Sequence, residues 1–75
     1  MNMEAGTLVR IFLYFMPNDP PVIRFGMITG PNKHDESAVD GEYFEDSTPY
    51  AKLFTLQDPK QHFDHLGRRV IEVLS

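Results

Sequence analysis

The sequence predicts a small α+β fold, in which an antiparallel β-sheet of three to four strands packs against one C-terminal helix. Three observations carry this prediction. Two segments rich in β-branched and aromatic residues flank a proline-rich turn, a third apolar segment follows an acidic stretch, and a helix-start signal stands at Asp58-Pro59. The expected order is β-β-loop-β-α, and a final short strand remains an alternative to the last part of the helix.

The first two strands are expected to form a hairpin. Thr7 to Met16 reads TLVRIFLYFM and Val22 to Thr29 reads VIRFGMIT, and prolines in the segment 17–21 end both strands because they lack an N–H. We place Met16 opposite Val22. Because side chains alternate along a strand, one face then becomes an almost purely apolar core face, which carries Val9, Ile11, Leu13, Phe15, Ile23, Phe25, Met27 and Thr29.

The opposite face of this hairpin is expected to be basic and aromatic. Arg10, Phe12 and Tyr14 alternate along the first strand, and Arg24 lies on the second. In this register Tyr14 stacks with Arg24, and Phe12 covers the backbone of Gly26. Such a surface has the general chemistry of a stacking platform for single-stranded nucleic acid. The alternatives are that the helix covers this face or that it forms a homodimer interface.

Residues 31–49 are predicted to be a long acidic loop. Six of the eleven acidic residues fall in this segment, with no Lys or Arg between Lys33 and Lys52: Asp35, Glu36, Asp40, Glu42, Glu45 and Asp46. The segment has little periodicity, and Val39-Asp40-Gly41-Glu42 fits a tight turn. Loops of this length are usually functional or mobile. Tyr50 to Leu56 (YAKLFTL) is the third predicted strand.

The C-terminal part of the chain begins with a helix-start signal and leaves two interpretations open. Asp58 is placed to cap a helix, Pro59 suits the first turn, and Gln61 completes a capping box. In one interpretation the helix runs to Leu74, with Phe63, Leu66, Val70, Ile71 and Leu74 on one stripe. In the other, the helix ends at Leu66, Gly67 is its left-handed cap, and Arg68 to Leu74 form a strand.

Composition restricts the class of protein. Seventy-five residues with 41% hydrophobic content make one small domain, covering residues 1–75. The chain has no cysteine, which suits a reducing compartment and removes disulfides and thiolate metal sites. The start lacks a signal peptide, and the longest apolar run is too short to span a bilayer, so we expect a cytoplasmic protein with no membrane contact. The net charge of −4 gives no bulk attraction to nucleic acid.

Dedicated chemistry is not expected. His62 and His65 share a face of the predicted helix near Asp58 and Asp64, but solvated helix histidines are the favoured interpretation over a metal site. An EF-hand centred on Gly41 fails because Ala38 and Ser47 fall where carboxylates are needed. No nucleophile, base and orienting group stand in a recognisable set. We therefore expect no cofactor, no metal and no enzymatic activity.

The function expected from the sequence is a non-enzymatic protein-binding module, a small regulator or inhibitor that docks on a larger macromolecular machine. Acidic side chains would speed encounter with a basic surface, and buried aromatic side chains would hold the complex. We therefore expect a protein partner with a basic surface. The predicted contact residues are Asp40, Glu42, Tyr43, Phe44, Glu45, Asp46 and Tyr50. Chains of this size are typical of accessory proteins, including those carried by phages and mobile elements. The alternative is nucleic-acid binding through Arg10, Phe12, Tyr14 and Arg24.

Overall fold

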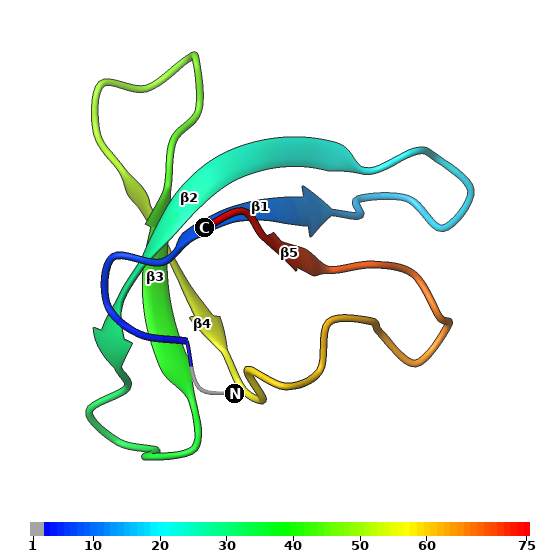
Figure 1. The fold of residues 1–75 in the computed structure, drawn as a ribbon. Helices are drawn as coiled ribbons and strands as arrows, with labels where there is room; N and C mark the ends of the chain where they lie inside the picture. Colours follow the sequence, from blue (N-terminus) through cyan, green and yellow to red (C-terminus); the bar gives the residue numbers. More distant parts are fainter. Residues whose placement is uncertain (1–2) are drawn as a thin grey trace.

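The computed structural model describes residues 3–75, which form one antiparallel sheet of five strands and contain no helix (Figure 1). The strand order is β4-β3-β2-β1-β5, so four strands form a meander and the last returns to lie beside β1. The predicted α+β class is therefore wrong, and this part of the chain is all-β. The strands are β1 Leu8–Leu13, β2 Val22–Pro31, β3 Val39–Tyr43, β4 Lys52–Leu56 and β5 Ile71–Val73.

The long strand β2 divides the sheet into two arms. Its residues 22–27 pair with β1 and its residues 26–31 pair with β3, so the two ladders overlap only at Gly26 and Met27. A register shift between Ile28 and Gly30 adds to the bend. Gly26 permits the close approach of β3, because a Cβ there would lie 2.5 Å from the carbonyl oxygen of Glu42. The arm of β3 and β4 consequently turns away from the arm of β1 and β5 (Figure 1).

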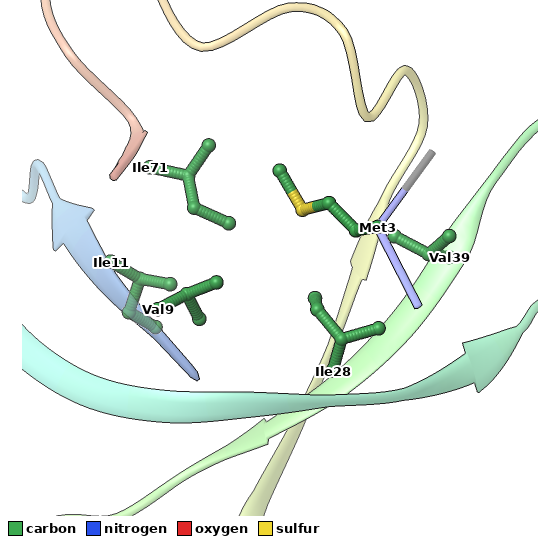
Figure 2. Close-up of a cluster of buried hydrophobic side chains, with 6 residues drawn as sticks. All are labelled: Met3, Val9, Ile11, Ile28, Val39 and Ile71. Carbon is green, nitrogen blue, oxygen red and sulfur yellow. The ribbon is translucent and has the colours of Figure 1, made fainter. Parts of the chain in front are cut away.

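The hydrophobic core lies on the inner side of this bend. Val9, Ile28 and Ile71 are fully buried, and Figure 2 shows side chains of both arms pointing toward one another. Met3, from the N-terminal segment, closes the group together with Ile11 and Val39. Around them pack the partly buried side chains of Leu13, Tyr43, Phe54, Leu56 and Val70. The opposite side of the sheet, which we call the outer face, is therefore convex.

The register of the hairpin differs from the predicted one. Leu13, and not Met16, lies opposite Val22. A shift by an odd number of residues moves the whole side-chain set of one strand to the other face. Val9 and Ile11 are in the core as predicted, but β2 turns its predicted core residues outward, where they are exposed: Ile23, Phe25 and Met27. Phe15 is also exposed, in the connection that follows β1.

The predicted acidic loop contains a strand. Val39 to Tyr43, expected in part as a tight turn, pair with β2 on one side and with β4 on the other. Gly41 makes the pairing possible because the Phe54 ring packs on its backbone, where a Cβ would lie 2.6 Å from Phe54 Cε1. The acidic segment is therefore a central strand between two short connections.

The predicted helix after Asp58 is absent from the described residues. Asp58 does cap a turn, since its carboxylate accepts the Lys60 N–H at 3.0 Å and its carbonyl accepts the Gln61 N–H. The turn does not continue, because the β-branched residues that follow pair with β1 as β5. Gly67 has the left-handed conformation expected of it (φ +78°), but it completes a turn in which its N–H bonds to the Asp64 carbonyl. Of the two open interpretations of residues 68–74, the strand agrees with the structure.

Candidate protein interface

The outer face of the sheet carries two rows of side chains that run across the strands, roughly perpendicular to them. The registers place Leu53, Glu42, Met27, Leu8 and Leu74 side by side from β4 to β5. The second row follows from the same registers and consists of Phe44, Phe25, Arg10 and Glu72. Both rows lie where the two arms meet, at the most convex part of the molecule.

Large apolar side chains on this face are exposed to solvent. Leu53 is 79% exposed, and Phe25 and Phe44 are each 61% exposed. Monomeric soluble proteins seldom expose contiguous apolar groups of this extent unless they bind something there. The outer face is therefore the candidate interface, and its exposed apolar residues are Leu8, Ile23, Phe25, Met27, Phe44, Leu53 and Leu74.

Arg10 lies at the centre of the outer face and its charge is balanced within the chain. Its Nη1 donates to Glu72 Oε1 at 3.0 Å, and its guanidinium carbon lies 5.5 Å from the centre of the Phe25 ring. The pair is partly exposed, so its net contribution to stability is small. The same arrangement places the Arg10 guanidinium over the Phe25 ring on the outer face.

Two of the predicted contact residues make contacts within the fold. Asp40 accepts hydrogen bonds from Asn32 Nδ2 at 2.9 Å and Thr55 Oγ1 at 2.8 Å. These bonds, the one from Asn32 first, hold the pKa of the Asp40 carboxyl below its ordinary value. Tyr43 points to the inner face, where its ring centre lies 6.2 Å from that of Phe54. The Tyr43 ring is therefore turned away from the outer face, whereas both hydrogen bonds to Asp40 end on Oδ1 and leave its Oδ2 outside them.

The other predicted contact residues remain accessible. Glu42 and Phe44 lie on the outer face, next to Met27 and Phe25. Glu45, Asp46 and Tyr50 belong to the connection between β3 and β4, which projects beyond the sheet (Figure 1). Tyr50 is 64% exposed. We call Glu42, Glu45 and Asp46 the acidic margin: Glu42 lies between Leu53 and Met27 on the outer face, and Glu45 and Asp46 follow Phe44 in the β3–β4 connection.

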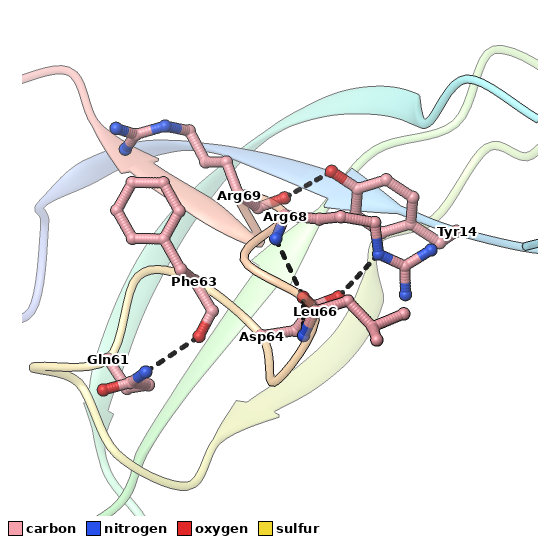
Figure 3. A network of polar contacts seen from close by, with 7 residues as sticks. All are labelled: Tyr14, Gln61, Phe63, Asp64, Leu66, Arg68 and Arg69. Atoms are coloured by element: carbon pink, nitrogen blue, oxygen red, sulfur yellow. Dashed lines mark hydrogen bonds and ion pairs between the residues drawn. The ribbon is translucent and has the colours of Figure 1, made fainter.

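The predicted nucleic-acid face is divided between different parts of the structure. Arg10 and Phe12 lie on the outer face, whereas Arg24 points to the inner one, where its Nη1 donates to the Ile23 carbonyl at 3.0 Å. Tyr14 donates its hydroxyl to the Arg69 carbonyl at 2.7 Å. The cation over its ring is Arg68, at 4.2 Å, and not Arg24 as predicted (Figure 3). The odd shift of the hairpin register separates the four residues.

The connection between β4 and β5 is held by its own polar network (Figure 3). Asp64 Oδ1 accepts the N–H groups of Leu66 and Arg68, each at 2.9 Å, and Asp64 Oδ2 accepts Arg68 Nε at 2.8 Å. Burial raises the pKa of the Asp64 carboxyl, but the hydrogen bonds from Arg68 and Leu66 outweigh burial and hold the pKa below its ordinary value. This network, with Tyr14, fixes the connection that delivers β5 to the sheet.

Metal-ligating side chains do not gather in the described residues. His62 Nε2 lies 3.1 Å from the Pro59 carbonyl, and His65 is exposed in the turn that begins at Asp64. Among residues 3–75, no group of three or more His, Asp or Glu side chains is placed to hold a metal ion. The same part of the chain contains no helix long and apolar enough to cross a membrane.

The composition of β2 already indicated an exposed apolar face, although the predicted hairpin register assigned those residues to the core. In β2 the odd positions Ile23, Phe25 and Met27 are all apolar, and the even positions also include Val22 and Ile28, so apolar side chains face outward whichever register β2 adopts. Leu53 and Leu74 gave no such signal, because each stands next to another apolar residue, Phe54 or Val73, that fits a core face equally well.

Comparisons with protein-family models, with curated proteins and with solved structures find no match to this chain. The candidate interface is therefore identified by the chemistry of its own residues: apolar side chains that are exposed to solvent, and carboxylates beside them.

Proposed function

We propose that this chain is a non-enzymatic protein-binding module, a small regulator or inhibitor that docks on a larger protein assembly. The single observation that supports the proposal most is the exposure of Phe25, Phe44 and Leu53 on one convex sheet face. Aromatic and large aliphatic side chains of this kind supply most of the binding energy when a partner buries them.

The partner that fits this face is a protein with an apolar depression bordered by Lys and Arg. A convex surface needs a concave partner, and two convex faces of this chain would meet over a small area. The acidic margin of Glu42, Glu45 and Asp46, in a chain of net charge −4, favours a basic rim. Such charges mainly speed the encounter of the two proteins, whereas the apolar side chains at the centre hold the complex together. We propose a cytoplasmic location, because a domain without cysteine does not depend on an oxidising compartment to fold.

The nucleic-acid alternative has lost the observation that favoured it. Arg24 and Tyr14 do not join Arg10 and Phe12 on one face, and Arg10 is paired with Glu72. We therefore keep nucleic acid as an outcome of the test below and not as a second proposal.

Site-specific photo-cross-linking tests the proposal. A benzophenone amino acid replaces Phe25 in one variant and Phe15 in a matched control, which is 72% exposed in the connection between β1 and β2. In cells of the native host, we expect the Phe25 variant to form a discrete cross-link to one protein and the Phe15 variant to form none to that protein. Equal labelling at both positions, or cross-links to nucleic acid alone at Phe25, would contradict the proposal.

A further inference from the structure

We propose that the free edge of β4 binds an extended segment of the partner, which adds to the sheet as a sixth strand beside Leu53 and Thr55. This inference rests on the proposed protein-binding function and names how the partner is held. The segment we infer carries Lys or Arg at the positions that face outward and apolar residues at the positions between them. Strand addition of this kind uses main-chain hydrogen bonds for affinity and alternate side chains for specificity.

The main-chain groups of Leu53 and Thr55 point away from the sheet. The Phe44 N–H donates to the Phe25 carbonyl, so the even-numbered residues of β3 at this end direct their main chain to β2. Because these directions alternate along an antiparallel strand, Gly41 and Tyr43 bond to β4. Their partners in β4 are Phe54 and Lys52. Leu53 and Thr55 therefore direct both their N–H and their C=O groups outward.

These groups are unoccupied within the part of the chain that the structure describes. β4 is the last strand on its side of the sheet, and the backbone hydrogen bonds found outside the ladders of residues 3–75 include none from Leu53 or Thr55. The Leu53 side chain is 79% exposed. The edge thus presents two donors and two acceptors next to an uncovered apolar side chain.

The opposite edge of the sheet is protected, which makes the open edge of β4 distinctive. β5 has only 3 residues, and the Arg69 guanidinium donates to the Ile71 carbonyl at 3.2 Å, occupying one of its outward acceptors. Natural proteins block edges with short strands, charges, prolines and bulges. By contrast, β4 has 5 residues, and its last four, Leu53 to Leu56, are uncharged. Its register with β3 has no bulge in the described residues.

Charge and polarity define the segment that fits. Asp40 and Glu42 lie on the outer face of β3, opposite Thr55 and Leu53. A Lys or Arg in the added strand extends over those two side chains toward the carboxylates, with its aliphatic stem on Leu53. On the inner face, Phe54 and Leu56 are partly buried and favour apolar neighbours. A second copy of this chain fits less well, since pairing β4 with itself would bring two sets of these carboxylates together.

A peptide titration tests the inference directly. The probe is the capped peptide Thr-Lys-Val-Lys-Val-Lys-Val-Thr, and the readout is the ¹H–¹⁵N spectrum of the isotope-labelled chain with hydrogen exchange at each amide. We expect saturable shifts centred on Leu53 and Thr55, and slower exchange of those two amides, in place of the fast exchange of free edge groups. Shifts confined to Phe25 and Phe44, with no protection at β4, would overturn strand addition.

Two controls interrupt the main-chain contacts in different ways. The same peptide with N-methyl groups on the Lys amides keeps every charge but blocks the edge that would pair with Leu53 and Thr55. The variant Leu53→Pro removes an outward N–H without losing a bond to β3. Each is expected to weaken binding about tenfold, the factor for one or two net hydrogen bonds. If neither change weakens binding, strand addition is wrong. The N-methyl control needs no variant, so it decides the question even if Leu53→Pro does not fold.

Two further outcomes separate this inference from the proposed function. A peptide with Glu in place of Lys is expected not to bind, and equal binding would refute the basic character of the segment. A dimer of the free chain by light scattering that Leu53→Pro dissociates would assign the edge to a second copy and overturn the inference. Cross-linking at Phe25 is independent of all these results, so the proposed function stands or falls separately.

Discussion

Tyr14→Phe is the substitution that most sharply tests how the β4–β5 connection is held. It removes one hydroxyl, which donates to the Arg69 carbonyl at 2.7 Å, and leaves the ring beneath the Arg68 guanidinium at 4.2 Å. The hydrogen bond joins residues 55 positions apart in the sequence, and it ties the end of β1 to the segment that leads into β5. Its loss therefore weakens long-range closure of the sheet.

The expected effect follows from the geometry of this bond. Hydrogen bonds between neutral groups contribute about 0.5–1.5 kcal/mol net, and this one is part-buried, so we expect a loss of about 1 kcal/mol. For a domain of 60–100 residues, that loss lowers Tm by about 4–8 °C. The ring area buried beneath Arg68 does not change, so no cavity adds to the loss.

Thermal and urea unfolding followed by circular dichroism measures this effect. The matched control is Tyr50→Phe, because Tyr50 is 64% exposed in the β3–β4 connection and its variant is expected to unfold within about 0.5 kcal/mol of the natural chain. Equal stability of the Tyr14 and Tyr50 variants would refute the structural role assigned to the Tyr14 hydroxyl.

Four further predictions concern the core, a turn, acid stability and the outer face. Ile28→Ala removes a side chain that is 0% exposed, and we expect a loss of about 2–5 kcal/mol in urea unfolding; a loss below 1 kcal/mol would show that Ile28 is not at the centre of the core. Gly67→Ala forces a Cβ onto a backbone at φ +78°, and we expect a loss of about 1–2 kcal/mol, with Gly67→Asn milder. The folded pKa of Asp64 is lowered, so its stabilising contribution is present above the unfolded pKa, near 4, and is lost as pH falls through the folded pKa. Asp64→Asn should therefore flatten the decline of stability between about pH 4 and pH 2. An unchanged decline would contradict this role of Asp64. Phe25→Ser should leave Tm within about 2 °C while reducing the fluorescence of a dye that binds exposed apolar surface; a large drop in Tm would mean that Phe25 supports the fold.

Local sequence signals located three of the strands but not their pairing. The segments 7–16, 22–29 and 50–56 are rich in β-branched and aromatic residues, and each covers all or most of a strand of the sheet. The register of the hairpin was not predictable in the same way. Prolines limit how far a strand can run but do not fix the length of the connection. Here β1 already ends at Leu13, and the hydroxyl of Tyr14 bonds to the Arg69 carbonyl, a contact that no local pattern shows.

Two predictions, the turn at residues 39–42 and the helix after Asp58, failed because tertiary contacts override local preference. VDGEY contains Asp, Gly and Glu, which are depleted in strands, yet it lies between two partners and packs Gly41 against Phe54. After Asp58 the turn signal is real, but the helix it announces would leave the edge of β1 unpaired. Ile71 to Val73 bond to that edge instead.

The candidate site was half predictable for a related reason. Glu42 and Phe44 were identified from acidic and aromatic composition, and both lie on the outer face. Tyr43 has the same composition signal, but strand alternation turns it inward toward Phe54. Once a segment is recognised as a strand, only every second residue remains available to a partner.

The affinity of the cross-linked partner for two matched variants tests the central claim most directly. Phe25→Glu places a charge in the middle of the outer face, whereas Phe15→Glu places the same charge at a more exposed position in the β1–β2 connection. Isothermal titration is expected to show at least about a hundredfold loss for Phe25→Glu, the cost of truncating a central aromatic anchor, and little change for Phe15→Glu. Equal affinities for the two variants would contradict docking through the outer face.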